Sequence, residues 1–449
     1  MVMTPYVIAF LKFYFIFTVI VMILFAIRHF IFTFNRMYCE QKLYYQDIID
    51  SDLPFITVLI PMHNEEKVAH GVLDALLESN YPVEKFEVIP INDFSEDGTK
   101  EILEDYAVRY GNIHPLHRNS GERGKPAALN RAMEMAQGEI IVVFDADYLP
   151  GKGLLENLST AFLDPEVGAV MGRVVPVNTK ANFLTRLLDL ERSGGYQVDQ
   201  QARYNLNLIP QYGGTVGGYR KDLMMGTDGF NTKILAEDTE LTYRLFCSGW
   251  KVLYANSAEC YEEAPEAWHI RARQIARWSR GHNEVMFRYV WKLVKSKYLS
   301  FWQKLDGMFL LFIYMMPVIL FFGLIDSILL FFLDEMDILE GWWVLLFLGA
   351  YNTFGNFAPF YQVGTANVID GSRERILLLP YLAFNFYFYL WFITKGFFNA
   401  LVDVLTRREA KWKRQNVLEK KNRMDLHDAC NFLLLVIFNN DSISFLAWI

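Results

Sequence analysis

Four long apolar runs limit what this chain can fold into. They cover residues 6–27, 307–333, 341–363 and 376–402. An apolar run of about 20 residues is long enough to cross the hydrocarbon core of a bilayer as a helix. The stretch between the first and second runs, about 51–265, is mixed in polarity. The sequence therefore predicts a globular domain that is inserted between membrane helices.

The first run predicts an uncleaved membrane anchor. Residues 6–27 contain Lys12 as their only charge. A cleaved signal peptide needs a basic start and a small-residue cleavage site, and the sequence shows neither. Arg28, Arg36 and Lys42 follow the run, and basic residues favour the cytoplasmic side of a membrane. We therefore expect a multi-pass protein of the plasma membrane whose globular domain is cytoplasmic.

The last of the four runs has flanks that conflict. The loop "DEMDILE" suits the outside face, whereas "GSRERI" at 371–376 and the basic residues after 402 both suit the cytoplasm. A single crossing by residues 376–402 cannot satisfy both of its ends. Either this run is re-entrant or interfacial, or the tail departs from the charge rule. A final apolar segment near the C-terminus is interrupted by polar residues and is predicted to be interfacial.

These features divide the chain into regions of different character. The predicted regions are a transmembrane anchor at 1–35, a cytoplasmic α/β domain at 51–265, amphipathic interfacial helices at 266–304, a transmembrane region at 305–402, and a basic tail with a short apolar interfacial segment at 403–449. The net charge of −8 argues against a nucleic-acid partner, which would require a basic face. The four cysteines are scattered without metal-ligand spacing, so neither a zinc site nor a disulfide framework is expected.

The central region alternates between strand and helix patterns. Residues 55–60, 86–93 and 139–147 are apolar and rich in β-branched residues, and helical patterns separate them. This alternation predicts a doubly wound, mostly parallel sheet, which binds ligands at the C-terminal ends of its strands. Several polar side chains fall at that edge: Asn64, Glu65, Asp93, Asp145 and Asp147.

Two carboxylates directly after the third predicted strand indicate a metal site. Asp145 and Asp147 flank a single alanine. Carboxylates placed in this way can bind Mg²⁺ or Mn²⁺ together with the oxygens of a diphosphate. Taken alone, the pattern is more often a turn cap, and the segment around Asp93 has the same ambiguity. Lys125, in a glycine-rich loop, fits either a phosphate contact or a solvated side chain.

Glu237 and Asp238 lie at a predicted helix start. An acid in this position is stabilised by the helix dipole, and a second acid can act as a general base if it faces the cleft. From these residues alone, the structural and the catalytic interpretations are equally supported.

The sequence "QIARW" places an amide, a guanidinium and an indole on one helix face. Gln274, Arg277 and Trp278 are spaced at i, i+3 and i+4. An amide and a guanidinium can hold a diphosphate, and an indole offers a flat apolar surface for a sugar ring. The alternative is an amphipathic helix whose arginines face lipid phosphates. These arginines are Arg271, Arg273, Arg277, Arg280 and Arg288.

The motifs are more specific in combination than singly. Over roughly residues 51–400 the chain resembles the processive family 2 glycosyltransferases, the synthases of cellulose, curdlan, mixed-linkage β-glucan, chitin, hyaluronan and poly-N-acetylglucosamine. The resemblance rests on "PMHNEE", "NDFSEDGT", "GKPAALN", "DAD", "GGTVGGYRKD", "AEDTELTYRL" and "QIARW". It implies a nucleotide-sugar-binding domain of GT-A type between transmembrane helices.

The resemblance implies roles for residues on the donor side of the site. Asp93 would contact the nucleotide, and Lys125 would line the same pocket. Asp145 would hold the nucleoside diphosphate and Asp147 the metal ion, Mg²⁺ or Mn²⁺. Glu65, in "PMHNEE", would lie at the same substrate-binding edge.

The resemblance also implies roles on the acceptor side. Asp238, beside Glu237, would be the base that deprotonates the acceptor hydroxyl. Gln274 and Arg277 would bind the diphosphate, and Trp278 would stack under the acceptor sugar.

Two further positions bear on the resemblance. Gly214 and Thr215 belong to the "GGT" segment that lies near the acceptor end in these synthases. Ala236 stands where the family usually has threonine, which changes a hydroxyl beside the base but not the base itself.

The implied activity is that of a UDP-sugar-dependent hexosyltransferase. It would be inverting and processive, and would extend a β-linked polysaccharide and move it across the bilayer, with accessory or export subunits as possible partners. UDP-glucose and a β-glucan are favoured, with N-acetylhexosamine polymers as the first alternative. A non-processive transferase that adds one sugar to a lipid is a second alternative. The last alternative is a non-catalytic transport or scaffold subunit with a degenerate nucleotide fold.

Overall fold

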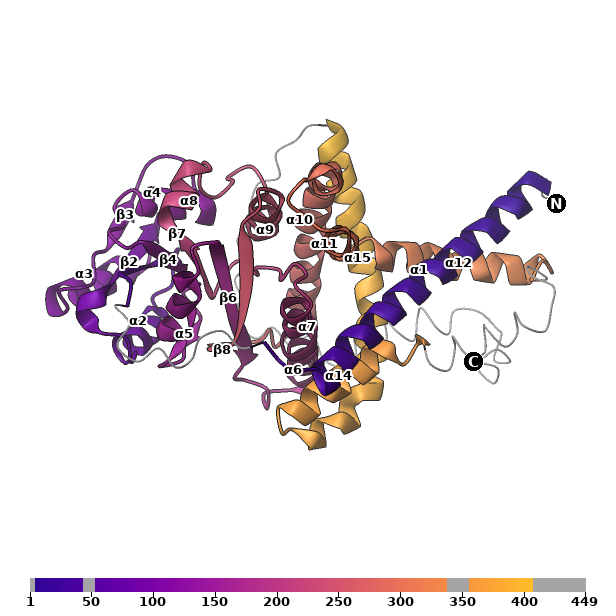
Figure 1. Ribbon diagram of the computed structural model, residues 1–449, viewed down its shortest axis with the longest axis horizontal. Coiled ribbons are helices and arrows are strands. Elements are labelled where there is room, and N and C mark those ends of the chain that lie inside the picture. Colours follow the sequence, from indigo (N-terminus) through magenta and orange to yellow (C-terminus); the bar gives the residue numbers. More distant parts are fainter. Residues whose placement is uncertain (1–4, 43–52, 337–354, 407–449) are drawn as a thin grey trace. The chain divides into compact units, whose positions relative to one another are not determined.

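The computed structural model describes residues 5–42, 53–336 and 355–406. Within these residues, an eight-stranded mixed sheet has the strand order β3-β2-β1-β4-β7-β6-β8-β5 (Figure 1). In chain order the strands are β1 (Ile56–Met62), β2 (Phe86–Asp93), β3 (Leu116–Arg118), β4 (Ile140–Val143), β5 (Leu149–Pro150), β6 (Val167–Pro176), β7 (Gly217–Arg220) and β8 (Lys251–Glu262).

The first half of this sheet is parallel, as the sequence predicted. β1 pairs in parallel with β2 and β4, and β2 pairs in parallel with β3. β7 is antiparallel to both β4 and β6, and β5 is antiparallel to β8, although β6 and β8 are parallel. The prediction of a mostly parallel sheet is therefore confirmed for the first four strands, and the complete sheet is mixed.

Both faces of the central strands are covered. Ile56, Val58 and Ile60 pack into one buried cluster, whereas Leu59 packs into the other. Such two-sided burial explains why these strands are continuous apolar runs. The strand predicted over 139–147 ends at Val143, so Asp145 and Asp147 lie in the turn that follows it.

Helices form a layer on each face of the sheet (Figure 1). α2 (Ala69–Leu77), α3 (Thr99–Arg109) and α5 (Leu154–Ser159) cover one face. The other face is covered by α4 (Lys125–Met133), α9 (Glu237–Cys247) and α10 (Trp268–Lys295). The other α-helices are α1 (Pro5–Tyr38), α6 (Phe183–Ser193), α7 (Gln201–Asn205), α8 (Lys221–Gly226), α11 (Phe301–Leu311), α12 (Met316–Phe332), α14 (Ala358–Ile369) and α15 (Leu382–Thr406).

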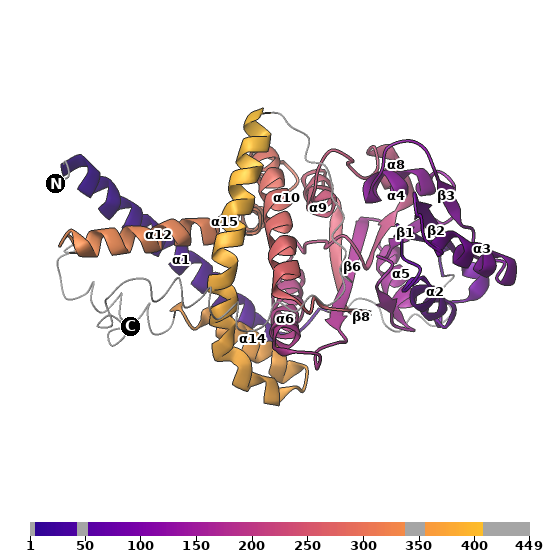
Figure 2. The same ribbon diagram turned by 180° about the vertical axis from the view of Figure 1, so that it is seen from behind.

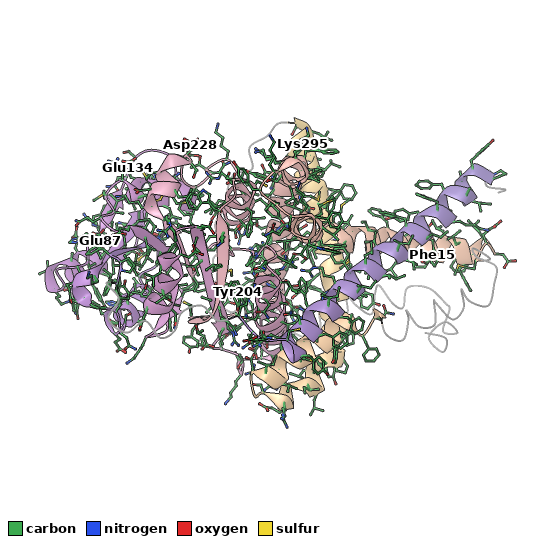
Figure 3. All side chains as sticks on the ribbon, in the orientation of Figure 1. Phe15, Glu87, Glu134, Tyr204, Asp228 and Lys295 are labelled. Carbon is green, nitrogen blue, oxygen red and sulfur yellow. The ribbon has the colours of Figure 1, made fainter. Side chains whose placement is uncertain are left out.

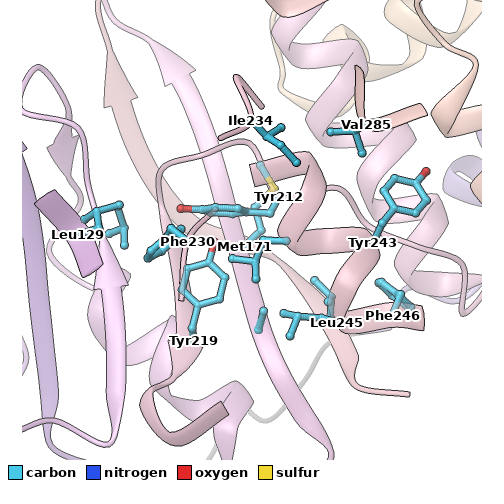
Figure 4. Packing of buried hydrophobic residues seen from close by; sticks show 14 of the residues in the cluster. Leu129, Met171, Tyr212, Tyr219, Phe230, Ile234, Tyr243, Leu245, Phe246 and Val285 are labelled. Atoms are coloured by element: carbon cyan, nitrogen blue, oxygen red, sulfur yellow. The ribbon is translucent and has the colours of Figure 1, made fainter. Parts of the chain in front are cut away.

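An aromatic cluster fixes the loops between β7 and α9. The ring of Tyr219 lies 5.0 Å from that of Tyr212 and 5.8 Å from that of Phe230, in edge-to-face geometry. Leu129 from α4 and Met171 from β6 complete the contacts around these rings (Figure 4). Edge-to-face pairs of buried aromatics contribute beyond their buried area, so this cluster holds the segment that precedes Glu237.

Two helical stretches among the described residues are long and apolar enough to cross a bilayer, Pro5–Tyr38 and Arg373–Thr406. The predicted run 307–333 is broken, because α11 and α12 meet at a bend of 62°. Pro317 lies in the first turn of α12, where its missing N–H is tolerated, and this favours a new helix start. Phe15 lies on the half of α1 that extends away from the sheet (Figure 3).

α15 lies along α10, which bears on the conflicting flanks of the last apolar run. Ser279 Oγ donates a hydrogen bond of 2.8 Å to the carbonyl of Ile393, and Arg280 pairs with Asp403 at 2.6 Å. Figure 2 shows α15 running beside α10 and across the direction of α12. This packing places α15 against the α10 helix, and the alternatives for the flanks of the last apolar run stay predictions.

Two predicted segments lie wholly or partly outside the described residues. Most of the run 341–363 does so, and its last residues belong to α14. The predicted tail, 403–449, is described only as far as Thr406, where α15 ends.

Candidate functional site

The predicted strand-end residues gather at one edge of the sheet. Asp93 is the last residue of β2, and its carboxylate accepts hydrogen bonds from Arg118 Nη1 at 2.6 Å and from the Gly124 backbone at 3.0 Å. Glu65 follows β1, and its backbone N–H donates to Thr99 Oγ1 at 2.8 Å. Asp93 therefore anchors the loop that leads into α4, while its predicted contact with a nucleotide stays a prediction.

Lys125 connects the strand-end acids to the "GGT" loop. As the first residue of α4, it places Nζ 2.5 Å from Asp145 Oδ1 and 2.6 Å from the carbonyl of Gly214. The backbone N–H of Asp145 donates to Thr215 Oγ1 at 3.0 Å. Burial alone would lower the pKa of Lys125, but the nearby carboxylates of Asp145 and Glu237 raise it. The lysine is therefore charged and lies among acids, so the alternative of a solvated side chain is wrong, while the phosphate contact stays a prediction.

Glu237 and Asp238 form the first turn of α9. A Cβ atom on Gly214 would lie 3.2 Å from Asp238 Oδ2, so the "GGT" loop reaches the predicted base. Burial, followed by the charge of Asp238, raises the pKa of Glu237 to about 7. Burial also raises the pKa of Asp238, against the opposing effects of the Thr239 backbone, Lys125 and Arg277.

The "QIARW" residues approach this pair from α10. Gly281 allows the approach, because an added Cβ atom would lie 2.9 Å from the Cβ of Ala236. Arg277 lowers the pKa of both Glu237 and Asp238, so its positive charge acts on the pair. Trp278 is partly buried against the core, and the Oε1 atom of Gln274 accepts from Arg271 Nη1 at 2.7 Å.

The alternative of arginines facing lipid is wrong for Arg271, and two of the other arginines are paired with acids. Arg271 is buried and pairs with Glu191 at 2.8 Å. Arg280 pairs with Asp403, and Arg288 pairs with Glu284 at 2.7 Å. An amphipathic pattern in the sequence could not show this, because each partner other than Glu284 lies far away along the chain.

The acids after β4 fit a metal ion that is shared with a substrate. Among the described residues, no group of three or more His, Cys, Asp and Glu side chains is arranged as a complete metal site. Mg²⁺ is commonly bound by one or two carboxylates together with substrate phosphates, which matches Asp145 and Asp147. Burial, followed by the charge of Asp145, raises the pKa of Asp147 to about 7, so a cation would favour its ionised form.

Several neighbours of the site could not be found from the sequence. Gln200 holds the segment that precedes the "GGT" loop. Its side-chain amide donates to the Gln211 carbonyl at 2.8 Å and accepts from the Gln211 backbone N–H at 3.0 Å. Gln200 ends a π-helical turn, Gly194–Gln200, a feature that is frequent at functional sites. No local sequence pattern predicts such a π-helical turn.

The mixed sheet and the helices on its two faces form a fold of GT-A type. Residues 57–225 match the family described as Glycosyl transferase family 2. This part of the chain is therefore similar to a family 2 glycosyltransferase domain.

Known proteins resemble the chain over a larger region. A probable glycosyltransferase of Bacillus subtilis, YdaM, is 33% identical over 250 residues, 55% of this chain and 59% of that protein. A β-monoglucosyldiacylglycerol synthase of a Nostoc species is 32% identical over 280 residues, 61% of this chain and 58% of that protein. The chain thus spans less than two thirds of either relative.

One solved structure shows the same fold. A mannosyltransferase from Pyrobaculum calidifontis, in complex with GDP-Man and Mn²⁺, has a TM-score of 0.56 at 21% identity. The match covers 80% of this chain and 98% of that one.

The backbone at Gly214 provides a first test of the site. Gly214 has a φ of +83°, and a Cβ atom there would press on Asp238 Oδ2 at 3.2 Å. We expect Gly214→Ala to lower kcat by at least about tenfold, because alanine disfavours this backbone and displaces the base. Gly371→Ala is the matched control, since Gly371 also has a positive φ, +73°, and nothing lies within 4 Å of its added Cβ. Equal kcat values for the two variants would show that the loop does not position Asp238.

The pH profile provides a second test. Because burial raises the pKa of both Glu237 and Asp238, we expect kcat/KM to fall as the pair is protonated, with an apparent pKa near the value of about 7 for Glu237. Arg277→Gln removes a charge that lowers both pKa values, so the acidic limb should move to higher pH. Carboxyl groups ordinarily titrate near pH ~4. If the acidic limb of the kcat/KM profile lay there and did not move in Arg277→Gln, its assignment to Glu237 and Asp238 would be contradicted.

Proposed function

We propose that this chain is a membrane-bound, inverting glycosyltransferase that extends a β-linked polysaccharide from a UDP-sugar. The main support is the convergence of Lys125, Asp145, Gly214 and Asp238 at one edge of the sheet. An acid that only caps a helix does not need a second loop beside it. Asp238 lies next to the Gly214 loop, whose carbonyl accepts a hydrogen bond from Lys125. The contact between Asp238 and Gly214 therefore favours the catalytic interpretation of this acid.

The residues suggest a single displacement. Asp238 takes the proton from an acceptor hydroxyl, whose oxygen attacks C1 of the donor sugar from the face opposite UDP. The bond from C1 to UDP breaks, and an α-linked donor gives a β-linked product. Lys125 and Arg277 stabilise the charge on the departing UDP. Asp145 and Asp147 would hold Mg²⁺ or Mn²⁺, which supplies positive charge to the diphosphate oxygens.

The acceptor side supports chain extension at a membrane. Trp278 lies partly buried on α10, and its proposed role is to contact the acceptor sugar; α1 and the α11–α12 pair supply apolar helices beside the domain. We infer a multi-pass plasma-membrane protein with a cytoplasmic catalytic domain, which passes its product between these helices. UDP-glucose is the favoured donor, and accessory or export subunits are compatible partners.

The second candidate function is transfer of one sugar to a lipid. The Nostoc relative, named as a β-monoglucosyldiacylglycerol synthase, favours it. The same catalytic residues would serve, and the difference would lie in what occupies the space next to Trp278.

Product analysis separates these functions. The full chain in lipid membranes would be given UDP-glucose, UDP-N-acetylglucosamine or GDP-mannose with Mg²⁺ or Mn²⁺. We expect UDP release from UDP-glucose, together with products of increasing length that linkage-specific β-glucanases digest. A single addition to diacylglycerol would favour the second candidate. The absence of nucleotide release from every donor would overturn both.

A further inference from the structure

A buried histidine lies next to the helix turn that carries the proposed base, and it has no part in the reaction described so far. His282 is on α10 and is 3% exposed. Its two ring nitrogens face two other helices, the first turn of α9 and the last turn of α11. Because a buried polar ring needs partners for its nitrogens, these partners show what the ring holds in place.

One hydrogen bond fixes which nitrogen of the ring carries the proton. Nε2 of His282 lies 3.0 Å from the carbonyl oxygen of Leu310, and a carbonyl oxygen can only accept. Nε2 is therefore the donor, and a neutral ring leaves Nδ1 as an acceptor. Burial lowers the pKa of His282 to about 4 against the opposing effect of the Leu310 carbonyl, so the ring is neutral at neutral pH.

The accepting nitrogen faces the residue that follows the proposed base. Nδ1 of His282 lies 3.5 Å from the hydroxyl of Thr239. This hydroxyl accepts a hydrogen bond of 3.2 Å from the side-chain amide of Gln211, so its own proton is available for Nδ1. A distance of 3.5 Å is long for a hydrogen bond, and such bonds in active sites often shorten when the substrate binds. The donors thus run in one direction, from Gln211 through Thr239 to His282.

Thr239 connects these hydrogen bonds to the base. It is 2% exposed, and its backbone N–H donates to Asp238 Oδ1 at 2.6 Å. The other carboxylate oxygen, Oδ2, lies beside the Gly214 loop, where an added Cβ would be 3.2 Å away. The two oxygens of Asp238 are therefore constrained from different sides, and a shift of Thr239 would turn the carboxylate.

The other side of the imidazole is held by the apolar helices. Leu310 lies in the last turn of α11, where carbonyl groups lack regular helical partners. The ring of Tyr314, from the segment between α11 and α12, meets the ring of His282 edge-on at 5.1 Å between centroids. His282 thus lies between the turn that carries the base and the bend of the α11–α12 pair.

We propose that His282 is a positioning residue for the base: its Nδ1 atom holds the Thr239 hydroxyl, and with it the first turn of α9, against α10 and α11. This inference rests on the proposed function, in which Asp238 removes the acceptor proton. It follows that loss of the bond to Thr239 lowers kcat. The KM for the UDP-sugar should change little, because the proposed donor contacts are made by other residues.

Two replacements of His282 separate its two hydrogen bonds. The amide of asparagine lies at the position of Nδ1 and can still accept from Thr239, whereas that of glutamine reaches the position of Nε2 and can still donate to Leu310. The assay is UDP release by the full chain in lipid membranes, with its active UDP-sugar. We expect kcat to stay within about threefold of the wild type in His282→Asn and to fall at least about tenfold in His282→Gln. In both variants the KM for the UDP-sugar should stay within about twofold of the wild type.

Variants of Thr239 test the same hydrogen bond from its other end. Thr239→Val keeps the shape of the side chain without the hydroxyl and should lower kcat as His282→Gln does. Thr239→Ser restores the hydroxyl and should restore most of kcat. The double variant His282→Gln/Thr239→Val should be no slower than the slower single variant, because both changes remove one interaction.

A second histidine provides the control. His70 lies on α2, on the other face of the sheet, and contacts the Tyr106 hydroxyl at 3.2 Å. His70→Asn and His70→Gln should both keep the wild-type kcat, and thermal unfolding midpoints would identify any variant that is merely unstable. Should both His282 variants unfold, the Thr239 pair decides.

Equal losses of kcat in His282→Asn and His282→Gln would overturn the positioning role, because a ring that only fills space does not distinguish them. Wild-type kcat in Thr239→Val would also overturn it. Absence of UDP release by the wild-type chain with every donor would instead overturn the proposed function itself.

Discussion

Replacement of Asp238 by asparagine is expected to lower kcat by about a thousandfold. General-base catalysis typically contributes 10²- to 10⁴-fold, and asparagine retains the size of the side chain without its basicity. The UDP-sugar should still bind, because the proposed donor contacts are made by the separate ion pair of Lys125 and Asp145. Release of UDP measures kcat, and calorimetric titration with the nucleotide sugar measures donor binding.

Two further variants show which acid is the base. Glu237→Gln should reduce kcat much less than Asp238→Asn, because the contact with the Gly214 loop belongs to Asp238. Asp222→Asn, in the first turn of α8, changes an exposed acid and should leave kcat unaltered. If Asp238→Asn retained a tenth of the wild-type rate, or if Glu237→Gln were the more damaging change, the role given to Asp238 would be wrong.

The parts of the fold that depend on local sequence could be predicted. β1 and β2 agree with the predicted strands, and α9 begins at Glu237, where the acids were expected to start a helix. These elements follow from hydrophobic period and from turn and cap residues within a few positions. For the same reason the acids after β4 were correctly placed beyond the C-terminal end of that strand, although the strand itself ends earlier than predicted.

The parts that depend on pairing across long stretches of sequence could not be predicted. β7 enters the sheet between β4 and β6 and reverses its direction there, which no local pattern specifies. The partners of Arg271 and Arg280 lie 80 and 123 residues away, so these arginines looked available for lipid when the structure buries or pairs them. The hydrogen bonds between Gln200 and Gln211 likewise depend on a π-helical turn that forms only in the folded chain.

A buried network of four charges provides the second large expected effect, this time on stability. Arg203 is 1% exposed and donates to Asp199 Oδ1 at 2.6 Å and to Asp306 Oδ2 at 2.5 Å. Arg28 of α1 bonds the same two acids, at 3.1 and 2.9 Å. The network thus joins the first apolar helix to α11 and to the turn that ends at Gln200.

Arg203→Met is expected to destabilise the folded protein by about 3–5 kcal/mol, because it leaves the buried carboxylate of Asp306 and the partly buried carboxylate of Asp199 with a single arginine. The midpoint of thermal unfolding in lipid membranes should fall accordingly. The double variant Arg203→Met/Asp199→Leu leaves one balanced pair, Arg28 with Asp306, and should recover most of the loss, since apolar replacement of both partners of a buried pair is often close to neutral. If Arg203→Met had the same midpoint of thermal unfolding as the wild type, the charges of the network would be solvated rather than buried. If the double variant were less stable than the single one, the packing of these side chains rather than their charge balance would hold α1 to the catalytic domain.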